Sequence, residues 1–135
     1  MIIRMSHVGV AVKDLEKTLK LYEDVLGLRP EAVKDMGRSR LAFIPVGDDE
    51  IELIQPSDVD GMLGKFLEER GEMVHHIALE TDDIEAAMEH VKSRGAIMLD
   101  EEPIVGAHGV RIAFFTLEGQ GDVAFELVES KSSEH

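Results

Sequence analysis

The sequence predicts an α+β fold made of two tandem βαβββ modules. Three observations lead to this prediction: an internal repeat, hydrophobic patterning that alternates between strand and helix periods, and a length that suits one domain. The chain has 135 residues, and domains commonly hold about 100–150 residues. We therefore expect one domain over 1–135, with a first module at 5–55, a linker with a short helix at 56–73 and a second module at 74–129.

The repeat consists of ordered matches between the two halves of the chain. The matched segments are HVGVAVKDLE at 7–16 with HIALETDDIE at 76–85, RLAF at 40–43 with RIAF at 111–114, and IELI at 51–54 with FELV at 125–128. The order of the partners is preserved, and their spacing drifts by a few residues, as loops of unequal length would produce. We therefore predict that both halves form the same structural unit.

Each module is expected to begin with a strand and a helix and to continue with three strands. In the first module, Asp14 suits the N-cap of a helix over 15–26, and Gly27 suits its end. In the second module, the expected helix covers 83–94 and ends at Gly95. The expected strands cover 5–12, 28–34, 38–45, 49–55, 74–81, 96–100, 110–116 and 122–129.

Glycines mark the expected linker and loops. Between the modules, Asp60 is expected to cap a short helix over 61–69 that ends before Gly71. Within the second module, the segment GAHG at 106–109 is expected to form a flexible loop.

The composition excludes several functional classes. A formal net charge of −14 argues against binding to nucleic acid or to an anionic membrane, because both attract basic surfaces. The absence of cysteine excludes disulfides, thiolate metal sites and cysteine nucleophiles, and it is compatible with a reducing compartment. We find neither a signal-peptide pattern nor an apolar run near the roughly 18 residues of a membrane helix. The expectation is a cytoplasmic protein that binds neither nucleic acid nor membrane.

Strand alternation places four potential metal ligands on one face of the predicted sheet. In the first module, apolar residues that should pack on the helix alternate with His7 in the first strand and with Glu52 in the fourth strand. In the second module, His76 and Glu126 hold the equivalent positions. Two imidazoles and two carboxylates suit Zn²⁺, Mn²⁺, Co²⁺ or Ni²⁺. The sequence therefore predicts a divalent metal site formed by these four residues.

The same alternation separates these candidates from their neighbours. His75, Gln55 and Glu129 should point to the opposite face, whereas Glu50 shares the face of Glu52 and remains a competitor. A single histidine or glutamate near a strand end is more often structural or solvated. The prediction of a metal site therefore depends on the joint, repeat-matched pattern.

Several segments resemble the vicinal oxygen chelate superfamily of glyoxalases, bleomycin resistance proteins and dioxygenases. They are HVGVAV followed by KDLE, GEMVHHIALE, DEEPIVGAHG and VAFELVE, and within the superfamily they look most like methylmalonyl-CoA epimerases. The resemblance covers 4–129 and implies a glyoxalase-like fold, in which a cupped mixed sheet surrounds a metal site. It also implies a homodimer, with metal ligands at His7, His76 and Glu126 and with Glu52 at the fourth ligand position.

The resemblance also implies a chemistry. A metal-dependent epimerase of this kind would act on an acyl-CoA thioester such as methylmalonyl-CoA through a metal-stabilised enolate. Glu126 and Glu52 are the candidate catalytic residues, because a base must remove a proton from the substrate. Arg40 and Arg111 could pair with a substrate carboxylate or phosphate, and His108 could contact the substrate. The commoner outcome is that such arginines are exposed residues balancing nearby acids and that the histidine is solvated.

The chain departs from the epimerase pattern before its last strand. Epimerases usually carry a His-Pro-Lys-Ser stretch and paired glycines there, whereas residues 115–122 read FTLEGQGD and lack that histidine, lysine and serine. Two alternatives therefore stay open. The first is another enzyme of the same scaffold, either a glyoxalase-type lyase similar to lactoylglutathione lyase or a ring-cleaving dioxygenase. The second is a non-catalytic small-molecule binding protein, against which the four candidate ligands count.

Overall fold

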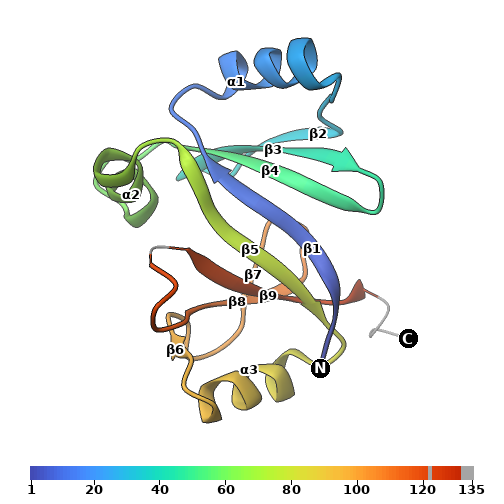
Figure 1. Cartoon of the computed structure of the whole chain (residues 1–135), viewed down its shortest axis with the longest axis vertical. Helices are drawn as coiled ribbons and strands as arrows, with labels where there is room; N and C mark the ends of the chain where they lie inside the picture. Colours follow the sequence, from blue (N-terminus) through green and yellow to red (C-terminus); the bar gives the residue numbers. More distant parts are fainter. Residues whose placement is uncertain (122, 132–135) are drawn as a thin grey trace. The chain divides into compact units, whose positions relative to one another are not determined.

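The structure is a computed structural model that describes residues 1–121 and 123–131, and its architecture is mixed α+β. Within these residues, nine strands form one hydrogen-bonded sheet in the order β2-β3-β4-β1-β5-β9-β8-β6, and β7 pairs with β8 (Figure 1). The strands are β1 (Ile2–Ala11), β2 (Ala32–Asp35), β3 (Ser39–Val46), β4 (Asp49–Pro56), β5 (Met73–Thr81), β6 (Ile97–Met98), β7 (Ile104–Val105), β8 (Arg111–Thr116) and β9 (Ala124–Glu129). The helices are α1 (Leu15–Leu21), the π-helix η1 (Tyr22–Leu26), α2 (Met62–Arg70) and α3 (Ile84–Ser93).

The chain divides into two compact units. One unit is His7–His75, and the other combines Met1–Ser6 with His76–His135. Each unit contains one copy of the sequence repeat. The two copies fold in the same order of strand, helix and further strands.

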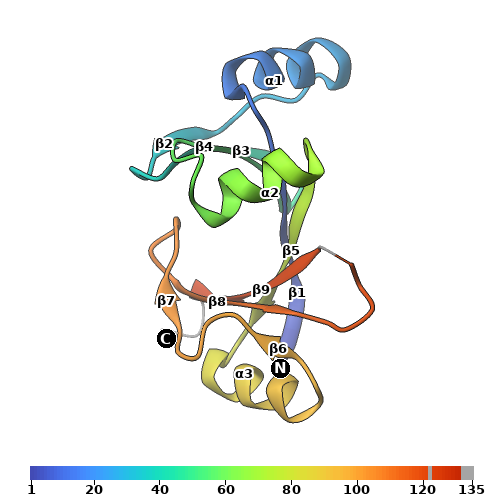
Figure 2. The same cartoon turned by 90° about the vertical axis from the view of Figure 1, so that its left-hand side faces the viewer.

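In the unit His7–His75, the end of β1 pairs in parallel with β4, and β4, β3 and β2 pair antiparallel in turn. Helix α1 lies along this group of strands (Figure 2). The core between them consists of buried apolar residues, namely Val12, Leu15, Ala42, Ile44 and Leu53. The sequence predicts that apolar residues of the first strand pack on the helix. This is confirmed for Val10, which packs against the core that includes Leu15 of α1.

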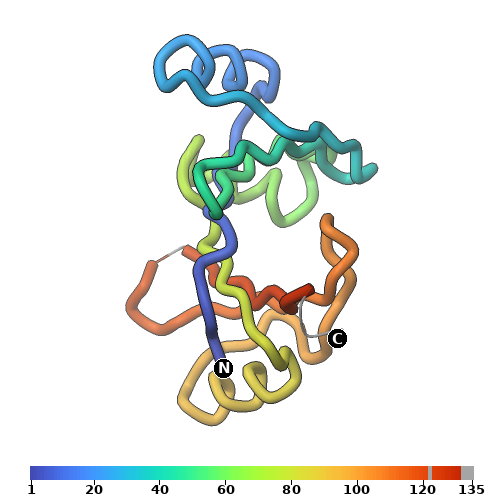
Figure 3. The backbone as a smooth tube through the Cα atoms, turned by 90° about the vertical axis from the view of Figure 1, so that its right-hand side faces the viewer, coloured from blue at the N-terminus to red at the C-terminus, as the bar shows by residue number. Residues whose placement is uncertain are grey.

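In the other unit, β5 pairs in parallel with β9, and β9, β8 and β6 pair antiparallel in turn. Helix α3 lies along the strands β8 and β9, as the chain trace shows (Figure 3). The core on the helix side consists of Ile84, Ala87, Met88, Ala113, Phe115 and Leu127. A second apolar cluster, formed by Ala78, Val110, Ile112 and Val128 with Phe114 packed against it, lies on the other side of these strands.

The predicted N-cap of the first helix is confirmed at Asp14, whereas the helix of the second module begins one residue later than expected, because Asp83 is its N-cap. The Asp14 carboxylate accepts a hydrogen bond from the Lys17 N–H, and the Asp83 carboxylate accepts one from the Ala86 N–H. The first helix extends to Leu26 as expected, but its last five residues form the π-helix η1. Gly27 then caps it with a φ of 69°, a left-handed conformation that glycine adopts without strain.

The linker and loop predictions need corrections. Asp60 does not cap α2, whose N-cap is Gly61. The side chain of Asp58 accepts the Asp60 N–H, and the Asp58 carbonyl accepts the Gly61 N–H, so the turn before the helix is built on Asp58.

The expected flexible loop at 106–109 is the turn of a β7–β8 hairpin. The Gly106 N–H donates to the Val110 carbonyl at 2.9 Å, and Ile104 lies opposite Ile112. The strand β7 was not predicted, because two residues are too few to show an alternating pattern. Among the described residues, no helix has the length and apolar character needed to cross a membrane.

Candidate functional site

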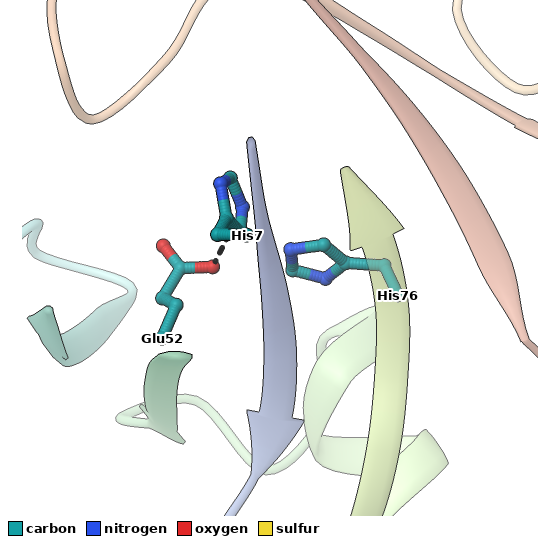
Figure 4. A group of neighbouring side chains, drawn as sticks. All are labelled: His7, Glu52 and His76. Atoms are coloured by element: carbon teal, nitrogen blue, oxygen red, sulfur yellow. Dashed lines mark ion pairs between the residues drawn. The ribbon is translucent and has the colours of Figure 1, made fainter. Parts of the chain in front are cut away.

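The unit His7–His75 brings His7 and Glu52 together. The parallel pairing of β1 and β4 places Gly9 opposite Glu52 and His7 opposite Glu50. The Nε2 atom of His7 lies 3.5 Å from Glu52 Oε1 (Figure 4). Both residues are buried, with exposed fractions of 4% for His7 and 6% for Glu52.

The other unit repeats this arrangement with His76 and Glu126. The parallel pairing of β5 and β9 places Ala78 opposite Glu126, as Gly9 is opposite Glu52 in the first copy. The Nε2 atom of His76 lies 3.3 Å from Glu126 Oε1. The exposed fractions are 2% for His76 and 5% for Glu126, so this pair is also buried.

An aromatic ring accompanies each histidine. The Phe43 ring lies edge-on to the His7 ring, with centroids 6.3 Å apart and planes at 80°. The Phe114 ring lies edge-on to the His76 ring, with centroids 5.4 Å apart and planes at 85°. Phe43 lies directly opposite Glu52 in the β3–β4 pairing, and Phe114 lies directly opposite Glu126 in the β8–β9 pairing.

The chemistry of these buried groups fits a divalent metal ion. Glutamate is rarely buried unless it is paired or bound to a cation, because burial removes the water that stabilises its charge. His7, Glu52 and His76, drawn in Figure 4, form a group that could hold a metal ion, with one ligand atom offered by each residue. Imidazole nitrogens and carboxylate oxygens are ligands that suit Zn²⁺ and similar ions.

The structure places His75 and Gln55 away from this face. His75 packs edge-on against Phe66 of α2, with ring centroids 4.9 Å apart. The Gln55 side chain accepts the Leu15 N–H at 2.7 Å, at the start of α1. The predicted orientations of His75 and Gln55 are thus confirmed. Glu50, the competitor of Glu52, lies half-buried opposite His7.

Arg111 binds carboxylates of its own unit. Its guanidinium donates to Glu129 at 2.9 and 3.1 Å and to Glu85 at 2.7 Å. The hydrogen bonds that Arg111 donates to Glu129 and Glu85 raise the pKa of Arg111 above its usual range, and the bond to Glu129 lowers the pKa of the Glu129 carboxyl. Arg111 shares its strand face with Ala113 and Phe115 of the core beneath α3. It therefore extends from the face opposite to Phe114 and Glu126.

Arg40 is the equivalent residue of the first copy. It donates a hydrogen bond to Glu16 of α1, and this bond lowers the pKa of the Glu16 carboxyl. Arg40 shares its strand face with Ala42 and Ile44 of the helix-side core. Contact of either arginine with a substrate would require these internal bonds to be exchanged, and the substrate role of both stays a prediction.

His108 lies in the turn of the β7–β8 hairpin and is half-buried, so it is less solvated than expected. Its role as a substrate contact also stays a prediction.

A comparison with protein families matches residues 6–114 to the Glyoxalase/Bleomycin resistance protein/Dioxygenase superfamily. The chain belongs to this superfamily. The match covers most of the chain and confirms the superfamily that the sequence motifs resemble.

Individual members of the superfamily refine this assignment. The ethylmalonyl-CoA/methylmalonyl-CoA epimerase of Cereibacter sphaeroides is 37% identical over 119 residues, which cover 84% of this chain and 88% of the relative. The structure is similar to a variant of the Streptomyces coelicolor methylmalonyl-CoA epimerase in complex with 2-nitronate-propionyl-CoA. The TM-score is 0.89 at 30% identity, and the match covers 98% of both chains. The predicted glyoxalase-like fold is therefore confirmed.

A superfamily member of another activity is also similar to this chain. The lactoylglutathione lyase of Neisseria meningitidis is 31% identical over 138 residues, which cover 98% of this chain and 94% of the relative. Relatives of this chain within the superfamily therefore catalyse more than one reaction.

Sequence reasoning missed the two phenylalanines beside the histidines. The signal was present, because Phe43 and Phe114 are the last residues of the repeat-matched segments RLAF and RIAF. Strand alternation within these segments places the phenylalanines on one face and the arginines on the other.

Proposed function

We propose that this protein is a metal-dependent epimerase of an acyl-CoA thioester similar to methylmalonyl-CoA. One observation carries the proposal: two buried, repeat-matched His–Glu pairs, separated by 3.5 and 3.3 Å, occur in a chain whose fold matches an epimerase structure over 98% of its length. That epimerase is in complex with an acyl-CoA compound, which supports a substrate of the same chemical class.

The proposed metal ligands are His7, Glu52, His76 and Glu126. The imidazoles would each offer a ring nitrogen and the glutamates a carboxylate oxygen, and the candidate ions are Co²⁺, Zn²⁺, Mn²⁺ and Ni²⁺. A bound divalent ion supplies positive charge that stabilises negative charge developing on the substrate oxygens. Elemental analysis of the purified protein would identify the ion.

The proposed catalytic residues are Glu52 and Glu126, either of which could exchange between metal ligand and base. Epimerisation breaks the bond between hydrogen and the carbon that lies between the thioester and the carboxylate of the substrate. The proton passes to a carboxylate oxygen, the electron pair stays with the substrate and spreads onto its carbonyl oxygens, and a proton returns to the opposite face of the carbon. Both glutamates have exposed fractions below a tenth, so few water molecules compete for the proton.

The test is deuterium exchange at this carbon of methylmalonyl-CoA in heavy water, followed by NMR. We expect rapid exchange with the metal-loaded protein and loss of exchange after chelation. The His76→Gln variant should lose exchange, whereas the matched control His75→Gln should keep it, because His75 packs against Phe66. Equal exchange by the wild type, the chelated protein and His76→Gln would overturn the proposal.

Glyoxalase-type activity is the second candidate, and the similarity to a lactoylglutathione lyase favours it. The same protein should then convert the hemithioacetal of methylglyoxal and glutathione to a thioester. Turnover of the hemithioacetal without exchange into methylmalonyl-CoA would replace the epimerase proposal by this one.

We also propose that the first and second modules, 5–55 and 74–129, act as one functional domain, and that the protein is a cytoplasmic homodimer. The support is the resemblance to the superfamily and a sequence without cysteine. Light scattering of the purified protein would measure the oligomeric state, and fractionation of the source cells would locate the protein.

A further inference from the structure

We infer that Phe43 and Phe114 are positioning residues, which orient the histidines and glutamates that the proposed function assigns to the metal. Each compact unit carries the same triplet of histidine, phenylalanine and glutamate. In one unit the triplet is His7, Phe43 and Glu52, and in the other it is His76, Phe114 and Glu126. This inference rests on the proposed metal site.

The first support is the placement of each phenylalanine between its partners. Phe43 lies opposite Glu52 on neighbouring antiparallel strands, and its ring also lies edge-on to His7. Phe114 stands in the same relation to Glu126 and His76. Edge-on packing at centroid distances of about 4.5–7 Å is a favourable geometry for aromatic rings. A single ring thus contacts the histidine and borders the glutamate of its own unit.

The second support is the type of strand pairing. The Phe43 carbonyl accepts the Glu31 N–H at 2.8 Å, and it therefore points away from β4. The Phe114 N–H donates to the Asp100 carboxylate at 2.8 Å, and the Phe114 carbonyl accepts the Leu99 N–H at 2.9 Å, so both groups point away from β9. Both Phe–Glu pairs are therefore of the non-hydrogen-bonded type, in which facing side chains lie closest together.

The third support is the burial of the ligands. The exposed fraction of each of the four ligands is 6% or less, so packing rather than solvent determines how each ring and carboxylate is oriented. A metal ligand must hold its donor atom within a narrow range of positions, and neighbouring side chains maintain that geometry. The phenylalanine rings restrict rotation of the imidazoles without competing for the ion, because they carry no donor atom.

The experiment compares Phe114→Leu with Phe114→Tyr and with the matched control Phe115→Leu. Phe115 is the next residue of β8. It is buried, whereas Phe114 is half-buried, and it stacks on Phe125 in the helix-side core, away from His76. Affinity for Co²⁺ is measured by titration calorimetry. NMR of the metal-free variants records the ring-current shifts that the phenylalanine ring imposes on the His76 imidazole protons.

We expect Phe114→Leu to weaken Co²⁺ binding about tenfold, the lower end of the effect of groups that orient metal ligands. It should also remove the ring-current shift, whereas Phe114→Tyr should retain both properties. Phe115→Leu should lower the melting temperature but change Co²⁺ affinity less than about twofold, since Phe115 packs in the helix-side core. The Phe43→Leu variant should act on His7 as Phe114→Leu acts on His76.

Equal Co²⁺ affinity in the wild type and Phe114→Leu, measured on folded protein, would overturn the inference. So would an equal loss of affinity in Phe114→Leu and Phe115→Leu, because that result would indicate a general loss of stability. These outcomes differ from failure of the proposed function, in which the wild type itself would bind no Co²⁺ and catalyse no exchange.

Discussion

The Nε2 atom of His76 lies 3.3 Å from the Oε1 atom of Glu126, within one compact unit of the chain. The two side chains come from β5 and β9, and both are buried. A second carboxylate–imidazole pair, Glu52 with His7, stands at the equivalent place of the other unit. Burial of two carboxylates is costly unless a cation balances their negative charge. Metal binding and folding should therefore be linked.

Metal addition should stabilise the wild type. Co²⁺ at about 100 times its dissociation constant should add about 2.7 kcal/mol to the free energy of unfolding. The Glu126→Gln variant should bind Co²⁺ roughly 10–100-fold more weakly, so its melting temperature should rise less at the same concentration. The control Glu118→Gln changes an exposed loop residue and should respond like the wild type. An equal response of Glu126→Gln would contradict a ligand role.

Loss of the Arg111 guanidinium should make stability less dependent on pH. Arg111 lowers the pKa of Glu129 in the folded protein, so this pair stabilises the fold above the unfolded pKa of about 4.3. The stabilisation is lost as the pH falls through the lowered folded pKa. Arg111→Met should therefore melt a few degrees below the wild type at neutral pH, and the difference should shrink in acid.

Thermal denaturation of Arg111→Met and the wild type between acidic and neutral pH would measure this effect. The control Arg29→Met removes an ion pair with Glu23 in which the arginine side chain is 78% exposed, and it should leave the melting temperature nearly unchanged. A raised KM for the substrate without a loss of stability would instead assign Arg111 to substrate binding.

Truncation of the core beneath α3 should destabilise the fold. Leu127 is fully buried against Ile84 and Met88, and Leu127→Ala should lower the free energy of unfolding by about 2–5 kcal/mol. Chemical denaturation would measure the change. Leu117→Ala serves as the control, because Leu117 is 38% exposed, and a similar loss there would argue against this core.

Removal of the N-cap of α3 should have a smaller effect. The Asp83 carboxylate accepts the Ala86 N–H at 3.1 Å, and Asp83→Ala should cost about 1 kcal/mol of stability. Asp83→Asn preserves a side-chain acceptor and should recover most of the loss. If Asp83→Ala unfolds at the same denaturant concentration as the wild type, the cap contributes nothing.

Several local features could be predicted because they depend on short stretches of sequence. The cap at Asp14 follows from a polar residue before a helical pattern. The linker helix begins one residue later than predicted, because Asp58 rather than Asp60 organises the turn before it. The hairpin strand β7 was missed because its pairing with β8 depends on contacts across a turn.

The orientation of the arginines could have been predicted and was not. Alternation along β3 and β8 places Arg40 and Arg111 on the face opposite to Phe43 and Phe114. The same rule correctly placed His75 on the face opposite to His76. Their partners, Glu16 and Glu85, also occupy equivalent positions of the repeat, since each is the last residue of the matched segments 7–16 and 76–85.

The sequence by itself determined the repeat, the cap of the first helix and the shared face of the candidate ligands within each copy. These features depend on the periods of strands and helices, which the order of residues along the chain sets directly. Only the tertiary structure decided that His7 approaches Glu52, that His76 approaches Glu126, and that a phenylalanine accompanies each histidine. These contacts join residues far apart in the sequence, so they depend on strand register, which is set when the sheet and its core assemble.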